Sequence, residues 1–141
     1  VRLMSTINLS ALKSTTAATP PTMQSRDGVD RGKFCRAWVS FGKNLGDVNQ
    51  YEIQSHFNVL AVEDTAAGQF TIQFKNAMPT NRFAIAGTAS QIQSQIMGMC
   101  INASNTAATP MTTTSVNIRT SVGSNTDSDP NYVCVYVYGD T

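Results

Sequence analysis

Several short runs of the chain alternate apolar and polar residues with a period of two. This is the pattern of β-strands that bury one face and expose the other. The clearest run covers 69–74, where Phe70, Ile72 and Phe74 alternate with glutamine and threonine. Comparable alternation predicts further strands over 33–41, 56–62, 83–86, 116–122 and 132–138.

Turn-forming residues separate these runs. The segment 63–68 ends in Gly68 and joins two strand-like runs, so it predicts a hairpin over 56–74. Pro79 predicts a turn before the next strand. Residues 91–101 have some helical spacing, but β-branched residues and Gly98 favour a strand with a bulge.

About seven short strands separated by turns are typical of an all-β fold, and we expect a single antiparallel β-sandwich resembling a jelly-roll knob. Residues 14–30 are rich in Thr, Ala, Ser and Pro and read as an extended connector. Residues 5–12 alternate in period two and predict a short arm strand. We therefore expect an N-terminal arm and connector over 1–31, used for attachment or oligomerisation, and a sandwich domain over 32–141.

The composition limits the classes of partner. The 141 residues are enough for one domain. Only 13% are charged, the net charge is +1, and no basic run is present, so we do not expect nucleic acid as a partner. The apolar runs are much shorter than the roughly 20 residues of a membrane helix, so we do not expect membrane insertion.

The cysteines Cys35, Cys100 and Cys134 are odd in number and widely spaced. This spacing fits neither a disulfide framework nor a paired-cysteine metal site. We expect free thiols that pack as small buried apolar residues in a protein folded in a reducing compartment.

Residues suited to catalysis are scarce. His56 is the only histidine, and no nucleophile or acid lies near it in the sequence. Asp127 and Asp129 lie near Asn125 and Asn131, but the glycine and glutamate of an EF-hand are missing, so solvated turn acids are favoured over a calcium site. No glycine-rich phosphate loop is present. The sequence predicts no catalytic, cofactor-binding or metal-binding residues, and therefore a protein that is not an enzyme.

Aromatic residues occupy the faces opposite the predicted core. If Val39 faces the core, Arg36 and Trp38 point away from it, and the same alternation turns Tyr136 outward. Trp, Tyr and Arg are enriched at interfaces, which favours a subunit contact or a ligand platform. The alternatives are that both faces pack inside a two-layer fold, or that the rings are ordinary amphipathic surface residues. The candidate subunit-interface residues are Ile7, Leu9, Arg36, Trp38 and Tyr136.

An ordered set of motifs gives the chain a family likeness. The motifs are FCRAWVSFG (34–42), SHFNV (55–59), GQFTIQF (68–74), AMP (77–79), FAIAG (83–87) and YVCVYVYG (132–139), preceded by TPPTMQSRDG (19–28). Together they resemble the β-sandwich module of bacteriophage tail fibres and related virion proteins, particularly of phages that infect aquatic bacteria. The resemblance covers about 19–139.

This resemblance implies a virion structural protein: a homotrimeric tail-fibre subunit or fibre knob, assembled in the host cytoplasm, that recognises the host surface. The arm would contact other virion proteins, and a host cell-surface glycan is the expected ligand. The segment 43–51 and the missing long shaft depart from the family pattern. A capsid decoration or cement protein is therefore the alternative, and a glycan-active enzyme using Asp127 and Asp129 is a weaker one.

Polar and aromatic residues in three predicted loops are candidate receptor contacts. Asn side chains can hydrogen-bond to sugar hydroxyls, and an exposed aromatic ring can stack on a sugar. The loops are 43–51, 102–114 and 123–131, and the candidates are Asn44, Asn49, Tyr51, Asn105 and Asn125.

Overall fold

The chain forms two compact units, Val1–Phe34 and Cys35–Thr141. The computed structural model describes residues 22–24, 30–33, 35–44, 46, 50–90, 97–102, 109–123 and 126–139. In the first unit, strand β1 (Thr22–Gln24) pairs antiparallel with β2 (Asp30–Lys33). β1 lies in the segment 14–30, which the sequence predicts to be an extended connector. The predicted arm strand over 5–12 lies outside the described residues.

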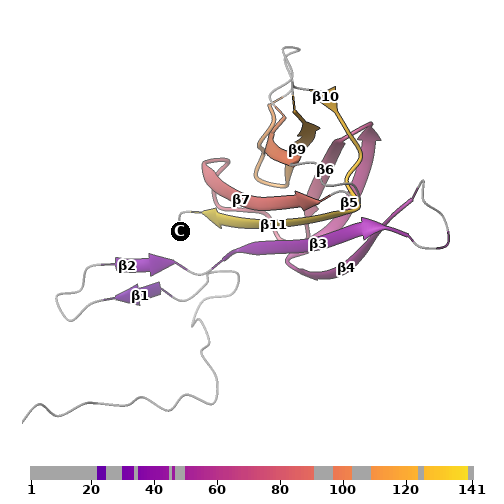
Figure 1. Cartoon of the computed structure of the whole chain (residues 1–141). Coiled ribbons are helices and arrows are strands. Elements are labelled where there is room, and N and C mark those ends of the chain that lie inside the picture. Colours follow the sequence, from indigo (N-terminus) through magenta and orange to yellow (C-terminus); the bar gives the residue numbers. More distant parts are fainter. Residues whose placement is uncertain are drawn as a thin grey trace, which may run out of the picture. The chain divides into compact units, whose positions relative to one another are not determined.

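The second unit is a single antiparallel sheet. Its strands are β3 (Ala37–Lys43), β4 (Tyr51–Phe57), β5 (Val59–Ala66), β6 (Gln69–Phe74), β7 (Phe83–Ser90), β8 (Met97–Ile101), β9 (Ser115–Val122), β10 (Thr126–Asp127) and β11 (Tyr132–Gly139). Their order across the sheet is β4-β3-β11-β7-β8-β9-β6-β5, and β10 pairs with β9 outside this path (Figure 1). The eight strands of the path form a nearly closed barrel.

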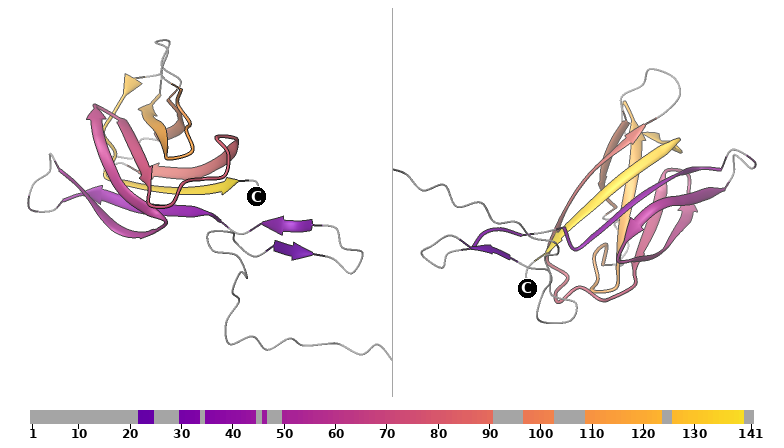
Figure 2. Two further views of the ribbon diagram at one scale, coloured as in Figure 1. Left: turned by 180° about the vertical axis from the view of Figure 1, so that it is seen from behind. Right: turned by 90° about the horizontal axis from the view of Figure 1, so that it is seen from below.

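The all-β antiparallel prediction is confirmed, and the strands of the second unit belong to one sheet. β6 and β9 lie opposite β3 and β11, as the layers of a sandwich would, but all belong to one curled sheet (Figure 2). Among the described residues, one ladder pair, Ala89 with Met97, joins β7 to β8. At the other side, β4 and β5 are the two edges of the sheet, and Asn58 alone separates them in the chain.

The corner at Asn58 overturns one predicted strand. The sequence predicts a strand over 56–62 with Phe57 and Val59 on the same face. Asn58 instead has a φ of 55°, in the left-handed region, and the strand breaks there. Phe57 is consequently 54% exposed, whereas Val59 is 2% exposed. The prediction of one continuous strand was wrong, because period-two alternation cannot detect a left-handed residue within a strand.

The core lies between the two halves of the curled sheet. Alternate residues of β3 and β11 point inward toward alternate residues of β6 and β9, as the alternation predicts. The buried cluster contains Ala37, Val39, Phe41, Val59, Phe70, Ile72, Phe74, Met78, Phe83, Val116, Ile118, Val133, Val135 and Val137. Each large apolar side chain buried here contributes roughly 1.5–3 kcal/mol to stability.

Three aromatic rings connect the halves at one end of the barrel. Phe41 of β3 and Phe70 of β6 meet edge to face, with ring centroids 5.2 Å apart. Tyr51, at the start of β4, contacts both rings, at 6.0 Å from Phe41 and 4.8 Å from Phe70. Side-chain packing therefore holds β4 near β6 at the edge where the sheet is not closed by backbone pairing.

The predicted hairpin within 56–74 is confirmed, with tighter bounds. β5 and β6 pair antiparallel, and the turn between them contains Gly68 at a φ of 66°. A Cβ on Gly68 would lie 2.6 Å from the carbonyl oxygen of Thr120, so the close approach also requires glycine. The N–H of the fully buried Thr120 donates to the carbonyl of Gly68 at 2.7 Å, which ties β9 to the turn. Its hydroxyl donates to the carbonyl of Ser128 at 2.8 Å.

The side chain of Asn58 fixes the corner through hydrogen bonds to two other parts of the chain. Its Nδ2 donates to the carbonyl of Arg36 at 3.2 Å and to the carbonyl of Asn76 at 3.2 Å. Its Oδ1 accepts from the backbone N–H of Asn76 at 2.8 Å. Asparagine is among the few residues that tolerate the left-handed region. Its backbone conformation and its side-chain hydrogen bonds therefore both explain why asparagine occupies position 58.

Replacement of Asn58 separates these two contributions. Asn58→Gly keeps the left-handed backbone accessible but removes the side-chain bonds, and we expect the free energy of unfolding to fall by about 1–3 kcal/mol. Asn58→Ala also strains the backbone and should cost about 1 kcal/mol more. Urea unfolding followed by the fluorescence of the single tryptophan measures both. Asn81→Ala, at an exposed turn position, is the control and should change little; an alanine variant at Asn58 more stable than the glycine variant would contradict this account.

Candidate functional site

The outward side of β4, β3, β11 and β7 carries a row of aromatic side chains. Phe57 of β4 pairs with Trp38 of β3, and Trp38 pairs with Tyr136 of β11. Tyr136 in turn pairs with Ala86 of β7. Residues paired across a ladder point to the same face, so three aromatic side chains lie side by side on adjacent strands. We name this outward side of the four strands the outer aromatic face.

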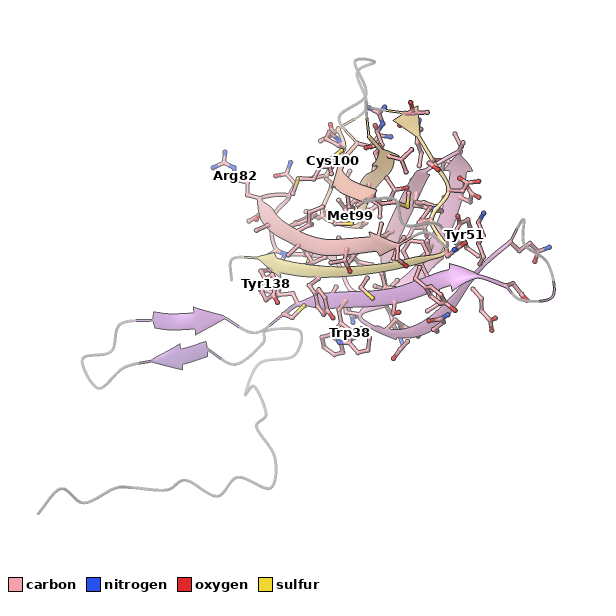
Figure 3. The ribbon with its side chains drawn as sticks, viewed as in Figure 1. Trp38, Tyr51, Arg82, Met99, Cys100 and Tyr138 are labelled. Carbon is pink, nitrogen blue, oxygen red and sulfur yellow. The ribbon has the colours of Figure 1, made fainter. Side chains whose placement is uncertain are left out.

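Two more tyrosines of β11 extend this face. Tyr138 pairs with Ala84, and Tyr132 pairs with Gly42 and Ser90. Trp38 and Tyr138 lie on the side of the sheet that faces away from Met99 and Tyr51 (Figure 3). The face is therefore separate from the core.

Exposure singles out this face within the described part of the chain. The exposed large apolar side chains there are Phe57, Leu60, Tyr132, Tyr136 and Tyr138, at 54, 64, 47, 43 and 42%. All except Leu60 belong to the outer aromatic face. Concentration of exposed rings on one face indicates a contact surface, because scattered surface apolar residues need no such explanation.

Small side chains fill the rows between the rings. Ser55, Ser40, Cys134 and Thr88 form one row across the four strands. The Cys134 Sγ lies 3.6 Å from the Ser40 Oγ. These residues place hydroxyl groups next to the aromatic rings.

A second group of polar residues lies near the Gly68 turn. The Asp127 carboxylate accepts from the Nε of Arg119 and, at 2.9 Å, from the Nε2 of Gln69. The Asn102 side chain donates to the Oε1 of Gln69 at 3.0 Å. The hydrogen bond from Arg119 lowers the pKa of Asp127. This network is satisfied internally, and it joins β6, β9 and β10.

Two further acids lie close to this turn. Asp129 accepts from the N–H of Gly68 at 2.6 Å. Asp64 of β5 has a raised pKa because its carboxyl is partly desolvated and because it is near Asp129, while Lys43 opposes the shift. The structure thus gives Asp127 and Asp129 partners within the fold, where the sequence predicts solvated turn acids.

The predicted receptor contact Tyr51 is a packing residue. Its ring packs against Phe41 and Phe70, and its hydroxyl donates to the carbonyl of Pro130 at 2.8 Å. Burial and the nearby acids Asp129 and Asp64 raise its pKa. The sequence places Tyr51 in a loop, whereas it begins β4. Its role as a receptor contact stays a prediction.

Of the remaining receptor candidates, the structure describes Asn44. Its Oδ1 accepts from the N–H of Gly46 at 2.7 Å, so it supports a local turn. The other three candidates, Asn49, Asn105 and Asn125, lie outside the described residues.

The predicted interface residues divide into three groups. Trp38 and Tyr136 are neighbours on the outer aromatic face, as their alternation predicts. Arg36 was expected to point outward with Trp38, but it is 6% exposed, and burial lowers the pKa of its guanidinium. Arg36 precedes β3, so the alternation of that strand does not reach it. Ile7 and Leu9 lie outside the described residues.

The cysteines are free, as predicted, but they are not the buried apolar residues that the sequence suggests. Cys100 is exposed, and Cys35 and Cys134 are half-buried. The single histidine, His56, is exposed on β4. Within the described ranges, no group of three or more His, Cys, Asp or Glu side chains is placed to hold a metal ion.

Phe57 is the functional candidate that sequence reasoning misses. The predicted continuous strand places Phe57 on the core face with Val59. Asn58 is the sequence signal that could have revealed the break between the two strands. An asparagine between two apolar residues can take a left-handed conformation and turn the next residue to the opposite face.

Comparison of the chain with family models, curated proteins and solved structures finds no match. The likeness to tail-fibre modules therefore stays a prediction. No helix among the described residues is long and apolar enough to cross a bilayer.

Replacement of two acids near the Gly68 turn should change the Tm at neutral pH in opposite directions. A raised pKa means that the folded protein binds the Asp64 proton more tightly than the unfolded chain does, so charged Asp64 destabilises the fold at neutral pH. We expect Asp64→Asn to raise the Tm at about pH 7 and to have little effect at about pH 3, where the carboxyl is protonated. Thermal unfolding across this range measures the difference.

Asp127→Asn is the matched control with the opposite sign. The lowered pKa of Asp127 stabilises the fold above its unfolded-state pKa, and this contribution is lost as the pH falls through the lowered value. The variant should therefore have a lower Tm at about pH 7. A lower Tm for Asp64→Asn at neutral pH would contradict the assignment of Asp64 as a destabilising charge.

Proposed function

We propose that the chain is a non-enzymatic structural protein of a phage virion, a tail-fibre subunit or fibre knob that contacts the host surface. The observation that carries this proposal is the outer aromatic face on a barrel whose core is already complete. The buried cluster packs between the halves of the sheet without Phe57, Trp38 or Tyr136. These rings serve no packing role in the core, so contact with another molecule explains them.

The sequence motifs support the virion assignment. FCRAWVSFG supplies β3, GQFTIQF supplies β6 with the Gly68 turn, and YVCVYVYG supplies β11. In this proposal the barrel is the jelly-roll-like knob, and residues 1–31 form the arm that joins it to other virion proteins. Trimerisation is assigned to the arm, which leaves the outer aromatic face available to a ligand.

Gold-labelled antibodies against residues 35–139 test the location on intact particles. We expect label at the tail fibres and a loss of adsorption to host cells when the antibody is present. Non-immune antibody at the same concentration is the control. Label confined to the head would contradict the fibre assignment and would support the decoration-protein alternative instead.

The oligomeric state tests the role of the arm. Light scattering of the full chain should give a mass about three times that of the 15.2 kDa chain. Ile7→Asp combined with Leu9→Asp should shift the mass toward the monomer, because charges on the alternating apolar positions oppose their burial. Leu60→Asp, on the exposed part of β5, is the control. Trimerisation through the arm would be contradicted if the parent chain were monomeric in solution and also bound to purified virions as a monomer.

A further inference from the structure

The outer aromatic face leaves much of the surface of four aromatic residues in water. Phe57, Tyr132, Tyr136 and Tyr138 are each between 42 and 54% exposed. Ring surface is therefore available to a partner. Rings in this position can receive a flat partner by stacking.

Tyr132 shows this arrangement directly. A Cβ on Gly42, its partner on β3, would lie 2.7 Å from the Tyr132 Cδ1 and 3.0 Å from its Cε1. The ring therefore rests on the backbone of Gly42, where any side chain would displace it. Glycine on the neighbouring strand thus permits the ring to pack against the sheet.

The face is nearly uncharged. Among the outward residues of β4, β3, β11 and β7, Glu52 at one end, paired with Gly42, is the only ionisable acid or base apart from tyrosine and cysteine. Ser55, Ser40 and Thr88 offer hydroxyl groups between the aromatic rows. A neutral partner with both apolar patches and hydroxyl groups matches this surface, whereas an acidic polymer meets no basic side chain and a basic polymer meets one acid, Glu52.

The size of the face suits a short ligand. Four strands about 4.8 Å apart and four rows about 6.6 Å apart give a flat footprint of roughly 500 Å². Two copies meeting over this footprint alone would reach about 1,000 Å², the lower limit for a specific interface. The face is large enough for a few sugar rings.

We propose that the outer aromatic face binds a neutral polysaccharide. The C–H faces of successive sugar rings stack on the row formed by Phe57, Trp38 and Tyr136, and sugar hydroxyls hydrogen-bond to Ser40 and Thr88. This inference rests on the proposed function, since it names the chemistry of the host-surface ligand. It assigns recognition to the sheet face instead of the loops.

The fluorescence of Trp38 reports on binding directly, because it is the only tryptophan of the chain. The probes are neutral hexasaccharides of glucose, galactose, mannose and N-acetylglucosamine, titrated separately into the full chain. We expect at least one of them to shift or quench the fluorescence in a saturable way. Sulfated dextran, a charged polysaccharide, should bind at least ten-fold more weakly.

Variants of the row test the site. Tyr136→Leu keeps an apolar side chain but removes the ring, and we expect affinity to fall roughly ten-fold, whereas Tyr136→Phe should retain it. Leu60→Ala removes an exposed apolar side chain outside the face and should bind like the parent. Circular dichroism of each variant establishes that the fold is kept. If Tyr136→Leu does not fold, Phe57→Leu on the neighbouring strand makes the same test.

Three outcomes overturn the inference: no saturable change with any of the four neutral probes, equal losses for Leu60→Ala and Tyr136→Leu, or a concentration-dependent increase in mass that Tyr136→Leu abolishes. The last would identify the face as a contact between copies. None of these outcomes depends on the gold labelling of virions, so a fibre protein that fails to bind neutral glycans would refute this inference and leave the proposed function standing.

Discussion

The left-handed conformation of Asn58 is the constraint on which the arrangement of the barrel depends. It lies between the two edge strands of one sheet, so the turn at this residue brings edges that are far apart in the strand order next to each other. Its side chain holds the approach to β3 and the turn after β6. The same turn sends Phe57 outward and Val59 inward. One residue thus both nearly closes the barrel and completes the aromatic row.

The central strands serve the core and the outer surface at once. In β11, three valines fill the core, and the residues that alternate with them, three tyrosines and Cys134, line the outer aromatic face. A strand can do this only because successive side chains point to opposite sides. The core faces are therefore constrained by packing against β6 and β9, whereas the outer side is free to carry rings that the fold itself does not require.

Local alternation predicts those strands whose two faces differ clearly in polarity. The strand predictions over 69–74 and 132–138 are correct because glutamine or tyrosine on one side contrasts with buried apolar residues on the other. β4 is missed because its residues are mostly exposed and lack the contrast. Closure of the sheet and the bonds of Asp127 and Tyr51 join residues distant in sequence, and no local pattern contains that information.

The two polar regions of the barrel differ in whether their groups already have partners. Near the Gly68 turn, Asp127 accepts from Arg119 and Gln69, and Asp129 accepts from a backbone N–H. A ligand there would have to break bonds whose loss leaves charged groups unsatisfied. On the outer aromatic face a ligand displaces only water from exposed rings and hydroxyl groups. A ligand would therefore bind at lower cost on the face, where Glu52 is the only acidic or basic side chain apart from tyrosine and cysteine, and this agrees with the neutral partner that we propose.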